Sequence, residues 1–132
     1  MDIRCIALDL DRTTLDEHGR LPEENRRALE AAMARGVHVV IASGRPLGSL
    51  PADVLAVPGI EYAVTSNGAA VWQLTPKACI HRLTMTPRSV EAILDLTEGE
   101  PVAVEIFIRG EAWAAADYVR DPVRYGATPQ AI

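Results

Sequence analysis

Apolar runs alternate with polar segments over the first part of the chain, and their spacing predicts strands and helices in turn. Residues 3–10 are almost continuously apolar, and residues 37–42 are rich in β-branched side chains. The first run is typical of a parallel strand that is covered on both faces, and the second predicts another buried strand. Between them, Pro22 begins a helical pattern that continues to about Arg35. Strand, helix and strand in this order predict a parallel pair joined by a right-handed crossover.

Shorter elements follow this unit. Residues 47–57 have a weaker helical pattern that Pro51 interrupts, and residues 62–65 predict a third strand. Residues 69–73 and 80–83 predict a hairpin. The elements up to residue 82 therefore predict one α/β unit built on a parallel sheet.

The pattern changes near residues 82–88, where we place a boundary between two units, 1–82 and 83–132. Residues 89–97 predict a short helix, and residues 102–108 and 111–116 predict two strands joined by a turn at Arg109 and Gly110. Residues 117–132 contain two prolines and a glycine and give no clear element.

Composition narrows the classes of protein. A net charge of −5 argues against binding nucleic acid or an anionic membrane through bulk charge. Two cysteines are too few for a disulfide scaffold, and we expect Cys5 to be a small reduced residue of the core. No signal peptide is evident, and no apolar run approaches the ~20 residues of a membrane span. We therefore expect a cytoplasmic protein.

Two acids, Asp9 and Asp11, stand where the first strand ends, in the segment DLDRTTLD. Side chains two positions apart on an extended strand point to the same side. Their repulsion is relieved by a hard cation such as Mg²⁺, and one carboxylate is then able to attack phosphorus while the second protonates the leaving oxygen. Taken alone, Asp9 and Asp11 fit a solvated acidic loop equally well, with Asp16 as its third acid.

Two further polar segments follow the second and third predicted strands, IASGRP and TSNGA. The carboxyl ends of parallel strands meet at one edge of a sheet, so the three segments are expected to converge there. Taken together they resemble the haloacid dehalogenase superfamily of phosphatases, in its Cof-type, sugar-phosphatase-like branch. The resemblance implies a Rossmann-like core over residues 1–82 and the start of an inserted α/β cap over residues 83–132.

The same resemblance assigns roles to individual residues. It implies that Asp9 is the nucleophile and gives a carboxylate oxygen to Mg²⁺. Asp11 is implied as the general acid and base, with its backbone carbonyl on the same ion. The residues implied to shape the site or to bind phosphate or substrate are Arg12, Thr13, Ser43, Gly44, Arg45, Asn67 and Gly68.

The sequence departs from the family pattern at two positions and lacks two of its motifs. Arg12 stands where glycine is usual, and Thr14 where an apolar residue is common. If position 12 requires a positive φ, arginine is strained there. The family's later lysine and its Gly-Asp segment follow the cap, and this sequence stops within the cap region. We therefore expect the amino-terminal portion of such an enzyme, with impaired activity.

These observations leave competing functional hypotheses. The first is a Mg²⁺-dependent phosphatase of small phosphorylated metabolites, such as sugar phosphates, that acts through an aspartyl-phosphate. The alternative is a non-catalytic remnant or interaction module that self-associates through an exposed sheet edge. A phospho-acceptor signalling domain is a third reading, but it expects an acceptor aspartate on a later strand. The third strand here ends in Ser66 and Asn67.

Overall fold

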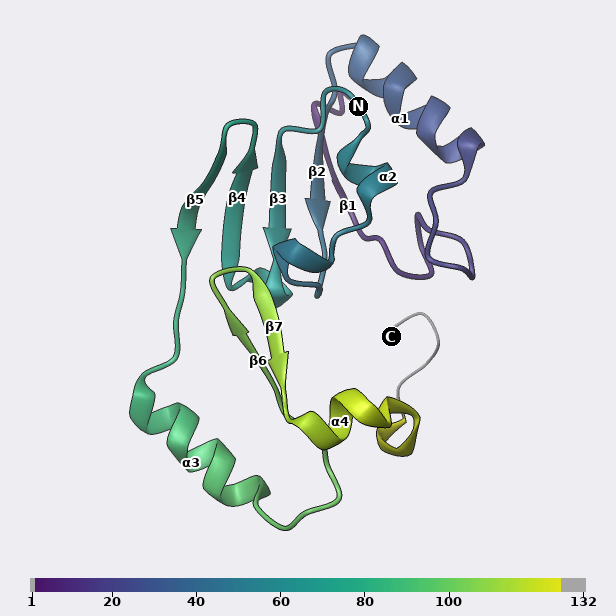
Figure 1. The fold of residues 1–132 in the computed structure, drawn as a ribbon. Helices are drawn as coiled ribbons and strands as arrows, with labels where there is room; N and C mark the ends of the chain where they lie inside the picture. The colour runs from purple at the N-terminus through teal and green to yellow at the C-terminus, as the bar shows by residue number, and fades with distance from the viewer. Residues whose placement is uncertain (1, 127–132) are drawn as a thin grey trace.

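The computed structural model describes residues 2–126 and contains two sheets (Figure 1). The larger sheet has five strands in the order β1-β2-β3-β4-β5. β1 pairs with β2 and β2 with β3 in parallel, whereas β4 and β5 extend the sheet as an antiparallel hairpin. The strands are β1 (Cys5–Leu8), β2 (His38–Ala42), β3 (Tyr62–Thr65), β4 (Ala70–Leu74) and β5 (Lys77–Arg82). The predicted α/β fold with a Rossmann-like parallel sheet is confirmed.

Two helices complete the core of this sheet. α1 (Glu23–Ala34) begins directly after Pro22, and α2 (Ala52–Leu55) is a short helix. Leu29 of α1 and Val54 of α2 belong to the same buried cluster as Val39 and Ile41 of β2. Because Val39 and Ile41 alternate with half-buried neighbours, this cluster lies on one face of the sheet.

The weak helical pattern over residues 47–57 forms two short elements, divided at the predicted interruption by Pro51. The segment forms a 3₁₀ turn, η1 (Leu47–Ser49), and then the separate helix α2. Proline has no N–H to donate and disfavours a helical conformation in the residue before it. Leu50, which precedes Pro51, is accordingly extended, with φ −70° and ψ 136°.

β1 is less covered than its apolar sequence predicts. Cys5 and Ala7 are exposed, Ile6 and Leu8 are half-buried, and Ile3 just before the strand keeps 57% of its surface exposed. The expectations of a strand covered on both faces and of a core cysteine are therefore wrong. β1 is an edge strand, so only β2 pairs with it among the described residues.

The second sheet is a two-stranded hairpin flanked by helices. It comprises β6 (Glu105–Ile108) and β7 (Glu111–Ala114). The helical elements around it are α3 (Pro87–Thr97), α4 (Ala116–Arg120) and the 3₁₀ turn η3 (Pro122–Tyr125). Figure 1 shows α3 standing apart from the five-stranded sheet. The unassigned segment 117–132 is thus partly helical, and residues 127–132 lie outside the described residues.

One turn joins the second sheet to the first unit. The amide of Gly48 in η1 donates a 2.8 Å hydrogen bond to the carbonyl oxygen of Gly110, in the β6–β7 turn. Gly110 has φ 91°, and a Cβ built there would lie 3.1 Å from Trp72 Cζ2 and 3.3 Å from Leu47 Cβ. Only glycine combines this backbone conformation with so close an approach. The hairpin turn therefore rests directly on the core of the larger sheet.

Within residues 2–126, no helix is both long and apolar enough to cross a lipid bilayer.

Candidate functional site

The segments that follow β1, β2 and β3 are tied together at one edge of the sheet. The Ser43 amide donates to the carbonyl oxygen of Val64 on β3, at 2.9 Å. The Ser66 amide donates to the carbonyl oxygen of Arg45, also at 2.9 Å. Because β1, β2 and β3 are parallel, their carboxyl ends share this edge. Arg45 also forms an ion pair with Asp11, in the segment after β1, so the predicted convergence of the three polar segments is confirmed.

The segment after β1 folds into a tight turn around Asp9. Thr13 Oγ1 donates a 2.7 Å hydrogen bond to Asp9 Oδ2, and Thr14 Oγ1 donates a 2.6 Å bond to the Asp9 carbonyl oxygen. The amides of Thr14 and Leu15 both donate to the Leu10 carbonyl oxygen, at 3.0 and 2.9 Å. Thr14 is buried, so its hydroxyl needs a partner and finds one in this turn. A threonine therefore suits position 14.

Arg12 lies in the left-handed region of backbone conformation, with φ 59°. Position 12 therefore does require a positive φ, and the arginine there is strained. The strain of one such residue is about 1–2 kcal/mol. Among the described residues, no hydrogen bond or ion pair holds the Arg12 side chain, although its charge helps to lower the pKa of Asp11.

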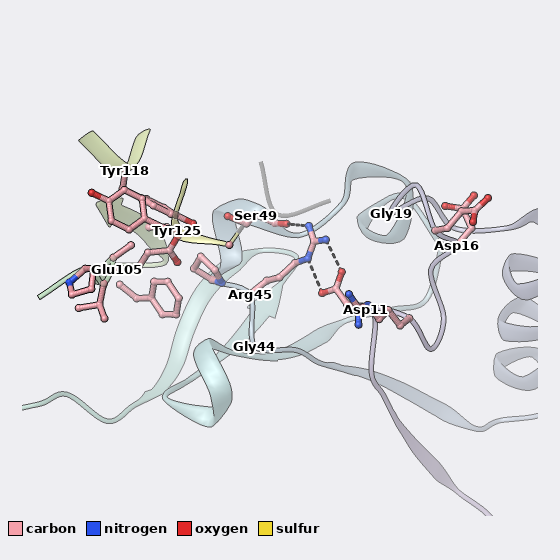
Figure 2. A pocket seen from close by; sticks show the side chains of 18 residues that line it. Asp11, Asp16, Gly19, Gly44, Arg45, Ser49, Glu105, Tyr118 and Tyr125 are labelled. Carbon is pink, nitrogen blue, oxygen red and sulfur yellow. Dashed lines mark hydrogen bonds and ion pairs between the residues drawn. The ribbon is translucent and has the colours of Figure 1, made fainter. Parts of the chain in front are cut away.

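Asp11 forms a two-pronged ion pair with Arg45 (Figure 2). Arg45 Nε donates to Asp11 Oδ2 at 2.9 Å, and Arg45 Nη2 donates to Asp11 Oδ1 at 2.7 Å. Arg45 Nη1 also donates to the Ser49 carbonyl oxygen at 3.0 Å. The hydrogen bond from Arg45 lowers the pKa of Asp11, and the same bond raises the pKa of Arg45. The ion pair thereby favours the carboxylate form of Asp11, which is the form that acts as a base.

The segments after β2 and β3 meet at a glycine. A Cβ built on Gly44 would lie 2.8 Å from Asn67 Oδ1, so the asparagine side chain needs the space that glycine leaves. Ser66, Asn67 and Gly68 all have positive φ, at 52°, 55° and 93°. Asparagine and glycine tolerate this conformation best, which explains the pair at positions 67 and 68. The Arg45 amide donates to Ser43 Oγ at 3.2 Å, and Ser43 is buried.

A cleft of about 1020 Å³ is lined by loops of the larger sheet and by residues of the second sheet and its flanking segments (Figure 2). Of the predicted site residues, Asp11, Arg12, Gly44 and Arg45 line one wall. The predicted residues that do not line it are Asp9, Thr13, Ser43, Asn67 and Gly68. Four of the nine predicted site residues, the Asp11–Arg45 pair among them, therefore lie at the cleft, and the other five do not line it.

The opposite wall comes from the second unit. It contains Glu105, Phe107, Tyr118 and Tyr125. Partial desolvation, followed by a hydrogen bond to Glu105, raises the pKa of Tyr118, and a 2.7 Å hydrogen bond to Asp117 raises the pKa of Tyr125. Sequence reasoning placed none of these four residues in the site. No motif marks them, because only the fold brings the hairpin and α4 to the cleft.

Oxygen donors for a metal ion are few in this part of the molecule. Within residues 2–126, no group of three or more His, Cys, Asp or Glu side chains is arranged to hold a metal ion. The carboxylate of Asp9 and the backbone carbonyl of Asp11 are hard oxygen donors, whereas the Asp11 carboxylate is paired with Arg45. Mg²⁺ is commonly held by one or two carboxylates, with waters and phosphate oxygens completing its shell. The donors present thus fit part of a Mg²⁺ shell.

Solved structures of known proteins share this fold. A haloacid dehalogenase-like hydrolase from Bacillus subtilis superposes with a TM-score of 0.74 at 26% identity, over 91% of this chain and 42% of its own. The sugar phosphatase BT4131, of HAD subclass IIB, superposes with a TM-score of 0.76 at 23% identity, over 93% of this chain and 48% of its own.

Curated relatives match by sequence. The phosphatase YwpJ of Bacillus subtilis is 30% identical over 80% of this chain and 36% of its own length. The 5-amino-6-(5-phospho-D-ribitylamino)uracil phosphatase YcsE of the same organism is 35% identical over 54% of this chain and 29% of its own length. The chain thus spans about a third of these relatives. Residues 6–125 match the sequence profile of the haloacid dehalogenase-like hydrolases. This match covers most of the chain, which belongs to the haloacid dehalogenase-like hydrolase family.

Proposed function

We propose that this chain carries the nucleophile-bearing part of a Mg²⁺-dependent phosphatase that acts on small phosphorylated metabolites. The observation that carries the proposal is the convergence of three strand-end segments, in which Asp11 meets Arg45 and Gly44 meets Asn67. Asp9 stands two residues before Asp11, in the same turn. An acid pair beside hydroxyl, amide and guanidinium groups suits phosphoryl transfer.

The first step transfers the phosphoryl group to the protein. Asp9 Oδ1 attacks the phosphorus atom, because Thr13 already occupies Oδ2. The bond between phosphorus and the ester oxygen breaks, and the departing oxygen takes a proton from the carboxylic acid form of Asp11. The products of this step are the free alcohol and an aspartyl-phosphate at position 9.

The second step regenerates the protein. The Asp11 carboxylate accepts a proton from a water molecule as the water oxygen attacks phosphorus. The bond between phosphorus and Asp9 then breaks, which releases inorganic phosphate and restores the Asp9 carboxylate. Asp11 ends this step protonated and ready to act again as an acid.

The remaining predicted residues form the surroundings of the phosphoryl group. Ser43, the backbone at Gly44, and the Asn67–Gly68 turn supply hydroxyl and amide donors, and Arg12 supplies a positive charge. Mg²⁺, when bound to Asp9 and to the Asp11 carbonyl, screens the charge of the phosphoryl oxygens. Thr13 orients Asp9 through the hydrogen bond described above.

The relatives and the cleft support a substrate class. Two relatives carry the names of a sugar phosphatase and of a phosphatase for a phosphorylated ribitylaminouracil. A cleft of about 1020 Å³ beside the acid pair has room for a metabolite of that size. The net charge of −5 does not favour nucleic acid or an anionic membrane as a partner. We propose a small sugar phosphate or a similar monoester, and a cytoplasmic location.

The direct test is turnover of p-nitrophenyl phosphate with Mg²⁺. The proposal expects Asp9→Asn and Asp11→Asn to abolish whatever turnover the chain has, and Asp95→Asn, an exposed residue of α3, to keep it. Because the chain spans about a third of the curated relatives, we expect its own turnover to be weak. Equal rates for the wild type and Asp9→Asn would refute the proposal.

A second candidate, a non-catalytic interaction module, is favoured by β1. This edge strand exposes Cys5 and Ala7, with Ile3 beside it, and a second copy that pairs along it would cover these residues. Sedimentation velocity distinguishes the candidates when it is combined with Mg²⁺ titration. A module predicts self-association without Mg²⁺ binding, whereas a phosphatase predicts Mg²⁺ binding that Asp9→Asn removes.

We also propose that the chain is divided into a core, residues 1–82, and part of a cap, residues 83–132. The last strand of the larger sheet ends at Arg82, and the second sheet begins at Glu105. Limited proteolysis is expected to cut first near residues 83–86, which are exposed and lie between β5 and α3. First cuts inside β2 or β3 would contradict this division.

A further inference from the structure

We propose that the two arginines beside Asp11 have different tasks: Arg45 is a positioning residue that fixes the Asp11 side chain, and Arg12 is the guanidinium that meets the substrate's anion. The inference rests on the proposed function, because it gives Asp11 the role of acid and base. It divides between two residues a task that the sequence pattern assigns to both.

Arg45 is anchored at both its side chain and its backbone. Three of its five side-chain N–H donors are engaged, two by Asp11 and one by the Ser49 carbonyl oxygen. Its backbone amide donates to Ser43 Oγ, and its carbonyl oxygen accepts from the Ser66 amide. Arg45 thereby links the segments that follow β1, β2 and β3.

The exposed fractions of the two side chains show which member of the ion pair is held by the fold. The Arg45 side chain is 23% exposed, whereas the Asp11 side chain is 48% exposed. The guanidinium is planar and its two donors match both carboxylate oxygens, so it fixes the plane of the Asp11 carboxylate as well as its position. Arg45 is the support in this pair, and Asp11 is the group that it orients.

Arg12 lacks the side-chain partners that hold Arg45. It lines the same wall of the cleft, yet no hydrogen bond or ion pair among the described residues holds its side chain. Its backbone is strained, with φ 59°, so that the turn presents this residue at a cost in stability. All five of its side-chain donors are thus available to an anion in the cleft.

The two tasks are separable by NMR on the chain as it is, without turnover. Three-bond couplings between the Asp11 carboxyl carbon and its backbone N and carbonyl carbon report whether the side chain holds one rotamer. We expect one rotamer in the wild type and in Arg12→Gln, and averaging over rotamers in Arg45→Gln. Arg45→Lys is not expected to rescue the single rotamer, because an ammonium group lacks the two coplanar N–H donors that bind both carboxylate oxygens of Asp11. An unchanged single rotamer in Arg45→Gln would overturn the assignment.

A second measurement covers the case in which Arg45→Gln does not fold. The Nε–H signal of Arg45 is followed in the wild type and in Asp11→Asn. Loss of a charge-assisted hydrogen bond is expected to speed its exchange with solvent by about tenfold or more. Arg45 Nε–H exchange that is already rapid in the wild type would overturn the assignment.

Titration with inorganic phosphate at constant pH then separates the two arginines. We expect the Arg12 Nε–H signal to shift and the Asp11 rotamer to persist, and we expect Arg12→Gln to weaken phosphate binding more than Arg45→Gln. A phosphate-dependent shift of Arg45 together with release of Asp11 would overturn the assignment. Absence of phosphate binding would count against Arg12 as the anion contact and against the proposed function, whereas the rotamer measurement still decides the role of Arg45.

Discussion

The two sheet units of this chain differ sharply in how well they bury their apolar residues. The buried hydrophobic residues of the described chain all lie between Leu10 and Trp72, around the five-stranded sheet. From residue 83 to residue 126, no residue is buried. Ile93, Leu96 and Trp113 in the second unit keep 42%, 79% and 61% of their surfaces exposed.

The difference follows from how each unit is layered. The larger sheet has helices that complete a core with it, whereas the smaller is a two-stranded hairpin, which is marginally stable by itself. The proposed chemistry therefore sits on the well-packed unit. The opposite wall of the cleft depends instead on how the hairpin turn rests on Trp72 and Leu47.

The largest expected effect contrasts a core residue with an exposed one. Ile41 is 0% exposed and Leu96 is 79% exposed. We expect Ile41→Ala to lower the free energy of unfolding by about 2–5 kcal/mol, because it leaves a cavity, and Leu96→Ala to change it by less than ~0.5 kcal/mol. Urea denaturation measures both. Similar losses for the two variants would show that the second unit has a core of its own.

The next effect concerns the contact between the units. Gly110 and Gly99 both have positive φ, but only Gly110 lies against Trp72 and Leu47, whereas nothing lies within 4 Å of a Cβ at Gly99. Alanine strains both positions, and crowding at Gly110 adds about 1–3 kcal/mol. We expect Gly110→Ala, unlike Gly99→Ala, to speed hydrogen exchange at the Gly48 amide. Equal exchange in the two variants would mean that the turn does not hold the hairpin.

A stabilising change is expected at Arg12. Replacing it with glycine relieves the left-handed strain and should raise the free energy of unfolding by about 1 kcal/mol. Arg109 has a similar φ of 54° but lies in the second unit, so Arg109→Gly should leave the main unfolding transition nearly unchanged. Thermal unfolding of both variants measures the difference. A lower stability of Arg12→Gly would mean that its side chain contributes more than the strain costs.

The smallest effect is the pH dependence of the Asp11–Arg45 pair. The hydrogen bond from Arg45 lowers the pKa of Asp11 below its ordinary value of 3.8. The pair's contribution is therefore complete above that value and is lost as the pH falls through the lowered pKa. Because Asp11 is half exposed, we expect no more than about 1 kcal/mol. The stability gap between the wild type and Arg45→Gln should narrow in acid, and a gap that widens there would contradict the pair.

Much of the larger sheet could be predicted from the sequence, because local patterns specify it. The third strand was predicted over the residues that form β3, and the helix after Pro22 corresponds to α1. On that helix Glu23 forms ion pairs with both Arg26 and Arg27. The exposure of Cys5 could not be predicted, since an apolar run does not tell whether its strand lies at the edge of a sheet.

The candidate site also has a part that the sequence predicts and a part that it does not. The convergence of the strand-end segments could be predicted, because parallel strands bring their carboxyl ends together. The fork between Asp11 and Arg45 joins residues 34 positions apart through side-chain geometry, which no local pattern encodes. Glu105 and Tyr118 were missed for a related reason, since they reach the cleft only through the turn that rests on the larger sheet.

The central claim is that Asp9 accepts a phosphoryl group at the edge where the three strands end. Fluorine NMR with Mg²⁺ and beryllofluoride, a phosphoryl mimic that binds carboxylates, tests it without requiring turnover. We predict bound fluorine signals in the wild type that are absent in Asp9→Asn and retained in Asp95→Asn. The same bound signals in Asp9→Asn, or no bound signal in the wild type, would contradict the account.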